Sequence, residues 1–430
     1  MNIFEKTYDV VVAGGGPAGF GAALAAARSG ASTLLIERYG YLGGMASTGL
    51  PFLTYQDGSG RQRIFGIPEE FAGRAREKGF TEDTPTSNYW LVVDPEGVKL
   101  LFQEMLVEAG VDILLHSWVG GAFTQVDSLE ALLVLSKGGN RAVRGKTFID
   151  CTGDADIAAL CGVPFVLGRE DGRTMGLSLL FSLTNVDTER FQEAVRGRWP
   201  DLVRESGMRI PEEITGNTFL GEEKFMPFMV NPVRKGEVIF NWVQQVLDVD
   251  PLEPEDLSRA EIEARRLIHI LVKEVLKPYV PGCEESYISS TAGQMGVRES
   301  RRIRGLYTLT ESDCREEADF PDSIALCTYH FDLHASSRKD SESVYLDREF
   351  RGAIRIPYRV MIPAEGPSNL LVAGRSVSAD RLALSAIRVM VPCMSMGEAA
   401  GHAAAMSAST GRPVRDVDID EVNRRSKFRI

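Results

Sequence analysis

Cysteine is scarce in this 430-residue sequence, and its few copies are scattered. The six cysteines stand at positions 151, 161, 283, 314, 327 and 393, and no two of them form a C-x-x-C pair. This spacing excludes most iron–sulfur, zinc and dithiol sites, and we expect no bound metal. Scattered cysteines are typical of a reducing compartment, so the sequence favours a cytoplasmic protein.

Positive charge and long apolar runs are also in short supply. Lysine and arginine together number 48 against 60 aspartates and glutamates, which leaves a net charge of -12. This acidic balance argues against a nucleic-acid partner. No apolar run approaches the roughly 20 residues of a membrane-spanning helix, and the first expected strand begins too early to leave room for a signal peptide. We therefore expect no membrane partner.

A glycine motif near the N-terminus predicts a dinucleotide site. The apolar run from Asp9 to Ala13 is typical of a buried strand, and Gly14, Gly16 and Gly19 follow it with the spacing G-x-G-x-x-G. The first glycine permits a tight turn, the second lets the backbone approach a pyrophosphate, and the third lets a helix pack closely on the strand. A helix rich in alanine follows at once, and its N-terminus favours a phosphate.

The residues after this helix complete the motif. Gly30 ends the helix, Thr33 to Ile36 forms a second strand, and Glu37 stands at the end of that strand. A carboxylate at this place accepts hydrogen bonds from ribose hydroxyls. Because strand, glycines, helix, second strand and acid occur in the expected order, a chance turn is the weaker explanation.

A glycine pair just past the acid indicates which dinucleotide binds. Arg38 follows Glu37, and Leu42-Gly43-Gly44-Met45-Ala46 comes shortly afterwards. Such a pair lets the chain turn sharply beside the pyrophosphate, although a plain surface turn is an alternative. Together with the glycine motif, this stretch resembles flavoproteins of the glutathione-reductase and fumarate-reductase type, whose first βαβ unit binds FAD.

Two later stretches end in residues suited to the same site. An apolar strand runs into Cys151-Thr152-Gly153-Asp154, which places N–H groups and a carboxylate at the carboxyl end of a sheet. A helix start with Asp154 as its N-cap is an alternative that is compatible with this role. Further on, a short strand ends in Gly374-Arg375, and Pro392 is expected to open a helix whose N-terminus points at the flavin. An ordinary packed helix is the alternative there.

Between these stretches the chain changes character. We expect strands over residues 175–183 and 238–246 and a long amphipathic helix over residues 254–277, with no second glycine motif. We interpret residues 168–358 as an inserted substrate domain. Residues 1–167 and 359–430 then form the dinucleotide-binding domain.

Over nearly its whole length the sequence resembles bacterial FAD-dependent oxidoreductases related to fumarate-reductase flavoproteins. The most specific stretches are residues 14–44, 151–156, 296–305 and 371–401. The resemblance implies an α/β fold, in which a Rossmann-like FAD-binding domain of the glutathione-reductase type carries an inserted α+β substrate domain. Residues 41–45 lack the histidine found in members with covalent FAD, so the resemblance implies non-covalent FAD.

The expected FAD contacts combine the motif residues with others that the resemblance implies, such as Val119 beside the adenine. The full set is Gly14, Gly16, Pro17, Ala18, Gly19, Glu37, Arg38, Gly43, Gly44, Met45, Val119, Thr152, Gly153, Asp154, Gly374, Arg375 and Met394.

An arginine cluster is the first candidate for binding the substrate. Arg298, Arg301 and Arg302 lie within five residues of one another. In a helix, Arg298 and Arg302 would share a face suited to a carboxylate or a phosphate. A surface cluster paired with acids such as Glu299 is the alternative.

The stretch His330-Phe331-Asp332-Leu333-His334 is the second candidate. On a strand, residues 330, 332 and 334 point to one side. Asp332 would then fix the tautomer of a histidine and raise its basicity, which makes a proton carrier near neutral pH. A satisfied structural histidine or a metal site is the alternative.

The expected catalytic set is Arg298, Asp332, His334 and Arg388, the last of which lies in one of the stretches that resemble the family. Arg381 occupies a position where relatives often have histidine, which points to an anionic substrate.

We expect an FAD-dependent oxidoreductase acting on a small organic substrate, with an anion as one option. The alternatives are an NAD(P)H-dependent flavin monooxygenase and an electron-transfer subunit of a larger complex, and a homo-oligomer is compatible with each. A flavin-containing RNA-modifying factor is disfavoured by the acidic balance.

Overall fold

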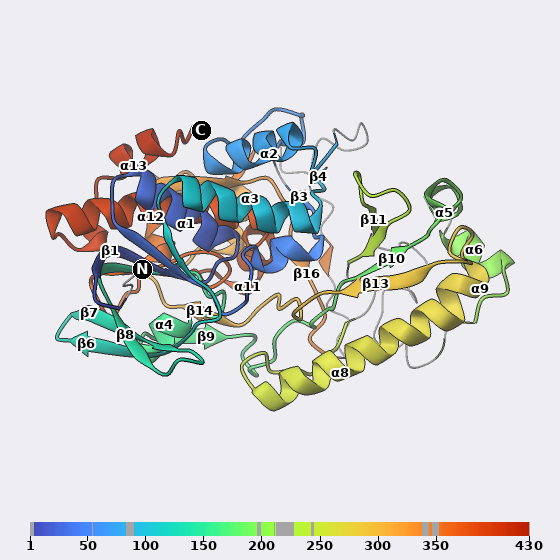
Figure 1. Ribbon diagram of the computed structural model, residues 1–430. Helices are drawn as coiled ribbons and strands as arrows, with labels where there is room; N and C mark the ends of the chain where they lie inside the picture. Colours follow the sequence, from blue (N-terminus) through green and yellow to red (C-terminus); the bar gives the residue numbers. More distant parts are fainter. Residues whose placement is uncertain are drawn as a thin grey trace.

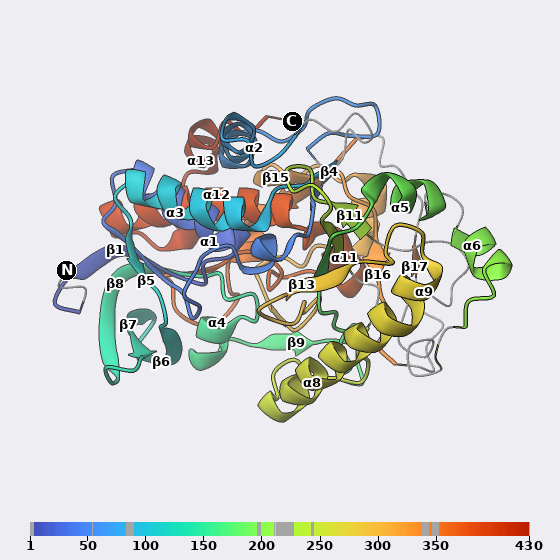
Figure 2. The ribbon, with the colours of Figure 1, turned by 45° about the vertical axis from the view of Figure 1, so that its right-hand side comes forward.

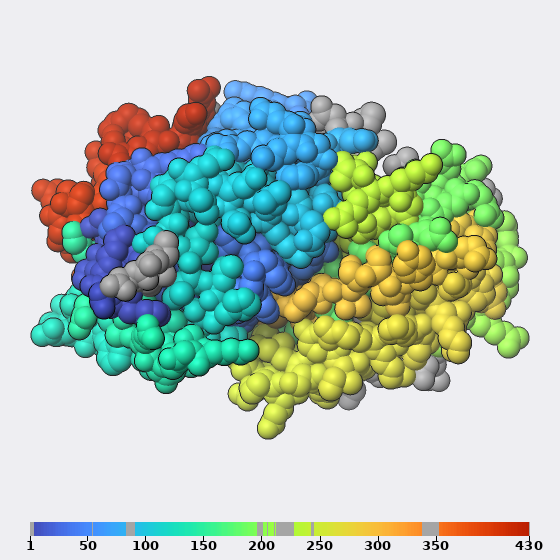
Figure 3. Space-filling view, viewed as in Figure 1, coloured from blue at the N-terminus to red at the C-terminus, as the bar shows by residue number. Residues whose placement is uncertain are grey.

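The computed structural model describes residues 4–53, 55–82, 90–195, 199–209, 211, 228–241, 245–337, 344–345 and 352–429 of the chain. These residues form two lobes, a larger one around a mainly parallel sheet and a smaller one around the long helix α8 (Figure 1). The space-filling view shows the smaller lobe packed directly against the larger one (Figure 3). The predicted α/β class with a Rossmann-like sheet is confirmed.

The sheet of the first lobe has seven strands in the order β5-β2-β1-β8-β7-β6, with β19 also paired to β8. Strands β5, β2, β1, β8 and β19 are parallel to one another, whereas β6, β7 and β8 form an antiparallel meander. Their bounds are β1 Thr7–Ala13, β2 Thr33–Ile36, β5 Asp112–Leu114, β6 Trp118–Gln125, β7 Ser128–Leu135, β8 Arg141–Asp150 and β19 Leu370–Val372.

The register of the parallel strands positions the site. Ala13 pairs with Asp150, and Asp150 pairs with Val372 on its other side. The three strands therefore end at the same edge, and the loops that begin at Gly14, Cys151 and Ala373 lie next to one another there. Ligands bind at this carboxyl edge in sheets of this kind.

Small residues let two helices lie close together on one face of the sheet. Helix α1 (Pro17–Arg28) and helix α12 (Met390–Thr410) cross directly over the strands (Figure 1). A Cβ atom added at Gly397 would overlap the carbonyl oxygen of Ala18, and one added at Gly401 would overlap that of Ala22. Helix α12 begins at Met390, two residues before the expected start at Pro392, because proline is tolerated anywhere in the first turn.

The remaining elements of the first lobe surround this layer. The sequence Asp94-Pro95-Glu96 is typical of a helix start, and the structure confirms it, since the Asp94 carboxylate caps α3 by accepting the N–H of Gly97 at 3.1 Å. The further helices are α2 Ile67–Glu77, α3 Pro95–Glu108, α4 Asp156–Leu160, α10 Glu311–Glu316, α11 Arg381–Ile387 and α13 Ile419–Arg425, with short 3₁₀ turns at η1 Gly44–Thr48, η4 Tyr358–Met361 and η5 Val414–Asp416. The short strand pairs are β3 Phe52–Leu53 with β4 Trp90–Leu91, β9 Phe165–Leu167 with β14 Arg301–Ile303, β15 Ser323–Cys327 with β18 Ile354–Pro357, and β16 Asp332–Leu333 with β17 Val344–Tyr345.

The second lobe has its own sheet and its own core. Its four strands run in the antiparallel order β11 (Phe228–Val230), β12 (Val238–Phe240), β10 (Phe181–Thr184) and β13 (Tyr287–Thr291). Helix α8 (Pro254–Leu271) continues through a π-helical turn (η3, Val272–Leu276) into α9 (Lys277–Tyr279), and α5 (Thr188–Val195) and α6 (Trp199–Glu205) lie at the far end (Figure 2). Both expected strands, over 175–183 and 238–246, are shorter than predicted, and residues 242–244 of the second lie outside the described part.

The two hydrophobic cores mark where the chain passes from one lobe to the other. The core of the second lobe is built from residues between Leu177 and Met295. From Leu309 onwards the buried residues join the core of the first lobe, well before the expected return at residue 359. By packing, the inserted segment is therefore shorter than residues 168–358.

Among the described residues, no single helix has the length and apolar character to cross a membrane. Helices α11 and α12 meet these criteria only as a pair, and they are bent by 91° relative to each other.

Substitution Gly397→Ala should lower the thermal unfolding midpoint, because the new methyl group forces α12 away from Ala18 of α1. Overpacking of this kind costs about 1–3 kcal/mol. The matched control is Gly73→Ala in α2, where a Cβ would meet no atom within 4 Å and where alanine favours the helix. Equal midpoints for the two variants would contradict the close helix contact.

Candidate functional site

A cavity of about 740 Å³ lies between the two lobes. Its volume is typical of small-molecule and cofactor sites. One wall comes from the carboxyl edge of the first sheet, and the other includes Ser178 and Leu180 before β10, Asn241 after β12, and residues 294–298. Of the expected cofactor residues, it is lined by Gly14, Gly16, Pro17, Ala18, Glu37, Arg38, Gly44, Met45, Val119, Thr152, Gly153, Asp154, Gly374 and Arg375.

The loop from Gly14 to Gly16 leaves open space in which a large anion could lie against the backbone. Gly14 has a φ of +97°, and a Cβ there would overlap the carbonyl oxygen of Cys151. Gly16, the N-cap of α1, has no atom within 4 Å of the place where a Cβ would stand. The N–H groups of the first turn of α1 are therefore approachable from the cavity.

Glu37 lies at one end of the cavity, held by backbone. Its side chain is 6% exposed, and its carboxylate accepts the N–H of Gly15 at 2.6 Å and the N–H of Tyr39 at 2.9 Å. Arg38 lies over the rings of Tyr39 and Trp118, 4.9 Å and 5.0 Å from their centroids. Val119 and Trp118 line the same end, and sequence reasoning did not identify Trp118.

An ion pair joins two of the three loops at the sheet edge. Nη2 of Arg375 lies 2.7 Å from Oδ1 of Asp154, which also accepts the hydroxyl of Ser300 at 2.6 Å. Burial raises the pKa of Asp154, but Arg375 and Ser300 outweigh burial and leave this pKa below its usual value. The N-cap of α4 is Ala155, so Asp154 is not the helix cap considered from the sequence.

Three expected cofactor residues do not line the cavity, because they serve packing. A Cβ at Gly19 would overlap the carbonyl oxygen of Gly14, and Gly43 takes a φ of +119° and donates its N–H to Gly15. Met394 is fully buried, and its carbonyl lies against Gly21 of α1. Because α12 starts earlier than predicted, Val389, Met390 and Cys393 line the cavity instead.

All four expected catalytic residues line the cavity. Arg298 donates to the carbonyl of Gly176 at 2.7 Å and to the hydroxyl of Ser178 at 3.0 Å. Arg388 donates to the carbonyl of Asp332 at 2.8 Å and to that of Arg298 at 2.9 Å. These contacts fix both guanidinium groups.

Arg298 and Arg302 do not share a helix face, since residues 301–303 form strand β14. Arg302 does not line the cavity, because it is buried in an ion pair with Glu299 and donates to the carbonyl of Gly168. Arg381 pairs with the same Glu299 at 3.0 Å and also lies outside the lining, so the anionic substrate suggested by Arg381 has no support at that position.

His334 is neutral in its surroundings, contrary to the sequence expectation of raised basicity. The ring is 2% exposed, with Nδ1 2.8 Å from Nε2 of Gln245 and Nε2 3.0 Å from Oδ1 of Asp332. Burial lowers the pKa of His334 to about 4, and Arg298 and Arg388 act in the same direction while Asp332 opposes them. Both ring nitrogens already face protein partners, so His334 orients Asp332 instead of carrying a proton itself.

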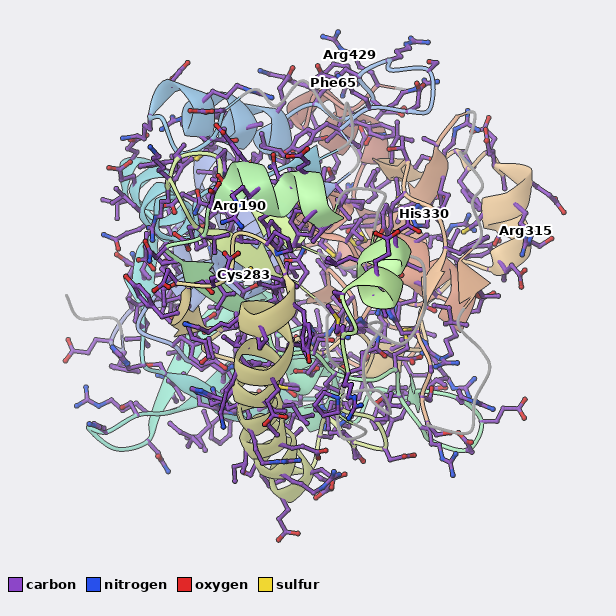
Figure 4. The ribbon with its side chains drawn as sticks, turned by 90° about the vertical axis from the view of Figure 1, so that its right-hand side faces the viewer. Phe65, Arg190, Cys283, Arg315, His330 and Arg429 are labelled. Atoms are coloured by element: carbon purple, nitrogen blue, oxygen red, sulfur yellow. The ribbon has the colours of Figure 1, made fainter. Side chains whose placement is uncertain are left out.

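Asp332 is the ionised partner of this pair. Burial raises its pKa, but His334, Arg388 and Arg298 outweigh burial and hold this pKa well below its usual range. His330, labelled in Figure 4, does not line the cavity, because β16 spans only two residues and does not place all three side chains on one face. Figure 4 also shows Arg190 of α5, which pairs with Glu284 beside Cys283 at the far end of the second lobe.

Sequence reasoning missed several polar residues that the second lobe brings to the cavity. Asn241 and Ser178 line it, and Gln245 lies behind His334. Gln294 accepts a hydrogen bond from Arg38 at 3.2 Å and donates to the sulfur of Met45 at 3.6 Å. No local motif surrounds these residues, so only the packing of the two lobes identifies them.

Residues 9–425 match the model of a protein family described as FAD dependent oxidoreductase. No curated protein matches the chain significantly. Similar solved structures include a geranylgeranyl bacteriochlorophyll reductase-like protein from Thermoplasma acidophilum, with 13% identity, a TM-score of 0.48 and coverage of 98% of this chain and 83% of that chain. Another is p-nitrophenol 4-monooxygenase from Pseudomonas putida, with 12% identity, a TM-score of 0.47 and coverage of 97% and 85%. Likenesses at this level carry no argument about activity.

The cavity wall fits FAD, the cofactor of that family. Gly16 leaves room for a pyrophosphate against the N-terminus of α1, and Glu37 presents a carboxylate at the end of β2. Elsewhere in the lining, Nε of Arg375 is buried without a hydrogen-bond partner among the described residues. Such a donor suits an acceptor of the bound cofactor.

Glu37→Ala should weaken FAD binding about 10- to 150-fold, because it removes charge-assisted hydrogen bonds worth roughly 1.5–3 kcal/mol. Residues 41–45 contain no histidine for a covalent link, so we expect acid treatment to release FAD. The affinity is then measured by titrating FAD into the apoprotein. Glu37→Gln, which preserves side-chain size, tests whether the loss comes from charge, and Glu77→Ala on the exposed surface of α2 is the control. Unchanged affinity for Glu37→Ala would exclude its contact with the ribose.

The ring of His334 should titrate with a pKa of about 4, as measured by NMR of the histidine signal that is absent from His334→Gln. Because this pKa lies below the ordinary 6.5, the unfolded state takes up the proton first as the pH falls. The contribution of His334 to stability is therefore present above about pH 6.5 and is lost towards pH 4, and His334→Gln should lose less stability over that range. A midpoint near 6.5 would contradict the buried, neutral ring.

Proposed function

The chain belongs to the family of FAD-dependent oxidoreductases, and from that premise we propose that its substrate is a small organic anion bound between the FAD-binding wall and the second lobe. The observation that carries the proposal is the charge in this part of the cavity. Arg298 and Arg388 both act on Asp332 and His334. Because His334 is neutral at physiological pH, two guanidinium groups face a single carboxylate.

The surrounding ion pairs leave this excess of positive charge uncompensated. Glu299, whose charge also acts on Arg388, is already paired with Arg302 and Arg381. Arg375 is balanced by Asp154. A monoanionic substrate would therefore bring the charge of the Arg298, Arg388 and Asp332 cluster to zero, and a partly enclosed cavity strengthens that attraction relative to water.

The residues of the chain have separate roles in this proposal. FAD, when bound, supplies the two-electron chemistry. Arg298 and Arg388 attract and orient the anion, and their hydrogen bonds to backbone carbonyls keep the guanidinium groups in place. Asp332 is the acceptor that faces the substrate, and His334 and Gln245 are positioning residues that hold its carboxylate.

Propionate should bind the FAD-loaded enzyme about tenfold more tightly than propionamide, its neutral counterpart, as measured by the change in the flavin absorbance spectrum. Arg298→Met should remove this preference, because it deletes one of the two cations. Asp332→Asn should increase propionate affinity, because it deletes the only carboxylate in the cluster.

The gain expected for Asp332→Asn is the decisive control, since a misfolded variant loses affinity and does not gain it. Equal binding of propionate and propionamide by the wild-type enzyme would overturn the proposal. So would a loss of propionate affinity in Asp332→Asn with the unfolding midpoint unchanged.

A further inference from the structure

Asn241 lines the cavity, and its buried amide oxygen receives no hydrogen bond from any described residue. The residue follows the last residue of β12 and lines the cavity from the second lobe. Its side chain is 2% exposed, and Oδ1 receives no hydrogen bond within the part of the chain that the structure describes. Buried polar atoms are rarely left in this state, so a ligand is the natural partner for this oxygen.

A second asparagine in the same sheet shows what a structural role requires. Asn231 follows the last residue of β11, the neighbour of β12, and is 3% exposed. Its Oδ1 accepts the N–H groups of Val233 and Arg234 at 3.1 Å and 3.2 Å, and its amide lies 3.3 Å from Asp94. Asn231 does not line the cavity. Both asparagines are buried, and each directly follows a strand of the same sheet. They differ in that only Asn241 lines the cavity.

The chemistry of the oxygen restricts its partner. An amide oxygen only accepts hydrogen bonds, so the partner is a hydroxyl or an amine. A carboxylate or a phosphate of a bound molecule offers no donor at neutral pH. The expected FAD contacts come from the first lobe, whereas Asn241 stands on the opposite wall with Ser178 and Arg298.

Resting on the proposed function, we propose that Asn241 is a specificity-determining residue that accepts a hydrogen bond from a hydroxyl group of the substrate, and that the substrate class is a small hydroxy-carboxylate. Charge decides between a hydroxyl and an amine. A hydroxy-carboxylate is a monoanion and matches the excess cation of the Arg298, Arg388 and Asp332 cluster. An amino acid has no net charge, and its ammonium group would be repelled by the two guanidinium groups.

A set of three-carbon probes tests this recognition on the FAD-loaded enzyme without measuring turnover. Lactate has the donor, propionate lacks it, pyruvate replaces it with an acceptor, and alanine has an ammonium group. Lactate should bind about 3- to 10-fold more tightly than propionate or pyruvate, and more tightly than alanine, as measured by perturbation of the flavin spectrum. A buried acceptor left unpaired by propionate or pyruvate is the cause of that difference.

Variants at the two asparagines separate recognition from folding. Asn241→Leu, which keeps the volume and removes the acceptor, should lower lactate affinity to that of propionate and should not lower the unfolding midpoint. Asn241→Asp keeps an acceptor but adds negative charge, so both affinities should fall while the preference for lactate remains. Asn231→Leu should lower the unfolding midpoint and leave the lactate-to-propionate ratio unchanged.

The outcomes distinguish this inference from the function on which it rests. A ratio near one in the wild-type enzyme, or an unchanged ratio in Asn241→Leu, overturns the inference while propionate binding still supports an anionic substrate. If Asn241→Leu loses FAD affinity and keeps the lactate-to-propionate ratio, the partner of the Asn241 oxygen is the cofactor. If alanine binds most tightly of the four probes, the partner is an amine. Either outcome overturns the inference. No binding of propionate overturns the proposed function and this inference with it.

Discussion

The pairing of β8 with two parallel neighbours is the constraint on which the site depends. Asp150, the last residue of β8, lies in register with Ala13 of β1 and Val372 of β19. A shift of one residue in either pair would separate the loops that follow these strands and turn their side chains to opposite faces. The carboxylate of Asp150 strengthens the arrangement, because it accepts hydrogen bonds from Thr152 and Ala158 at the start of the next turn.

Buried ion pairs extend this order beyond the sheet edge. Glu299 holds Arg302 and Arg381 away from the cavity, and Asp154 holds Arg375 at its edge. Unpaired cations in the wall would otherwise be costly to bury and would compete for the same anion. Arg302 and Arg381 therefore stay outside the cavity lining, whereas Arg298 and Arg388 line the cavity.

The sequence predicted the first lobe well, because its signals are local. The glycine motif, Glu37, the Asp94 cap and the loop after β8 each follow from short patterns whose physical reasons hold in any chain. The segment expected as an insertion, residues 168–358, was harder, because its chemistry depends on distant packing. Arg298 and Arg302 would share a face in a helix, but pairing with the distant strand β9 makes residues 301–303 a strand. The pKa of His334 was expected to be set by Asp332, although burial is the larger effect. Asn241 belongs to no motif, and only the cavity reveals it.

Gln294 joins the two lobes across the middle of the cavity, where it contacts both Arg38 and Met45. Nearby, Gly293 lies so close to the hydroxyl of Tyr41 that a side chain at this position would meet it at 2.5 Å. Gln294 thus ties two of the expected cofactor residues, Arg38 and Met45, to the second lobe. A movement of the second lobe would therefore also move side chains expected beside the cofactor, which links the packing of the lobes to the lifetime of the loaded enzyme.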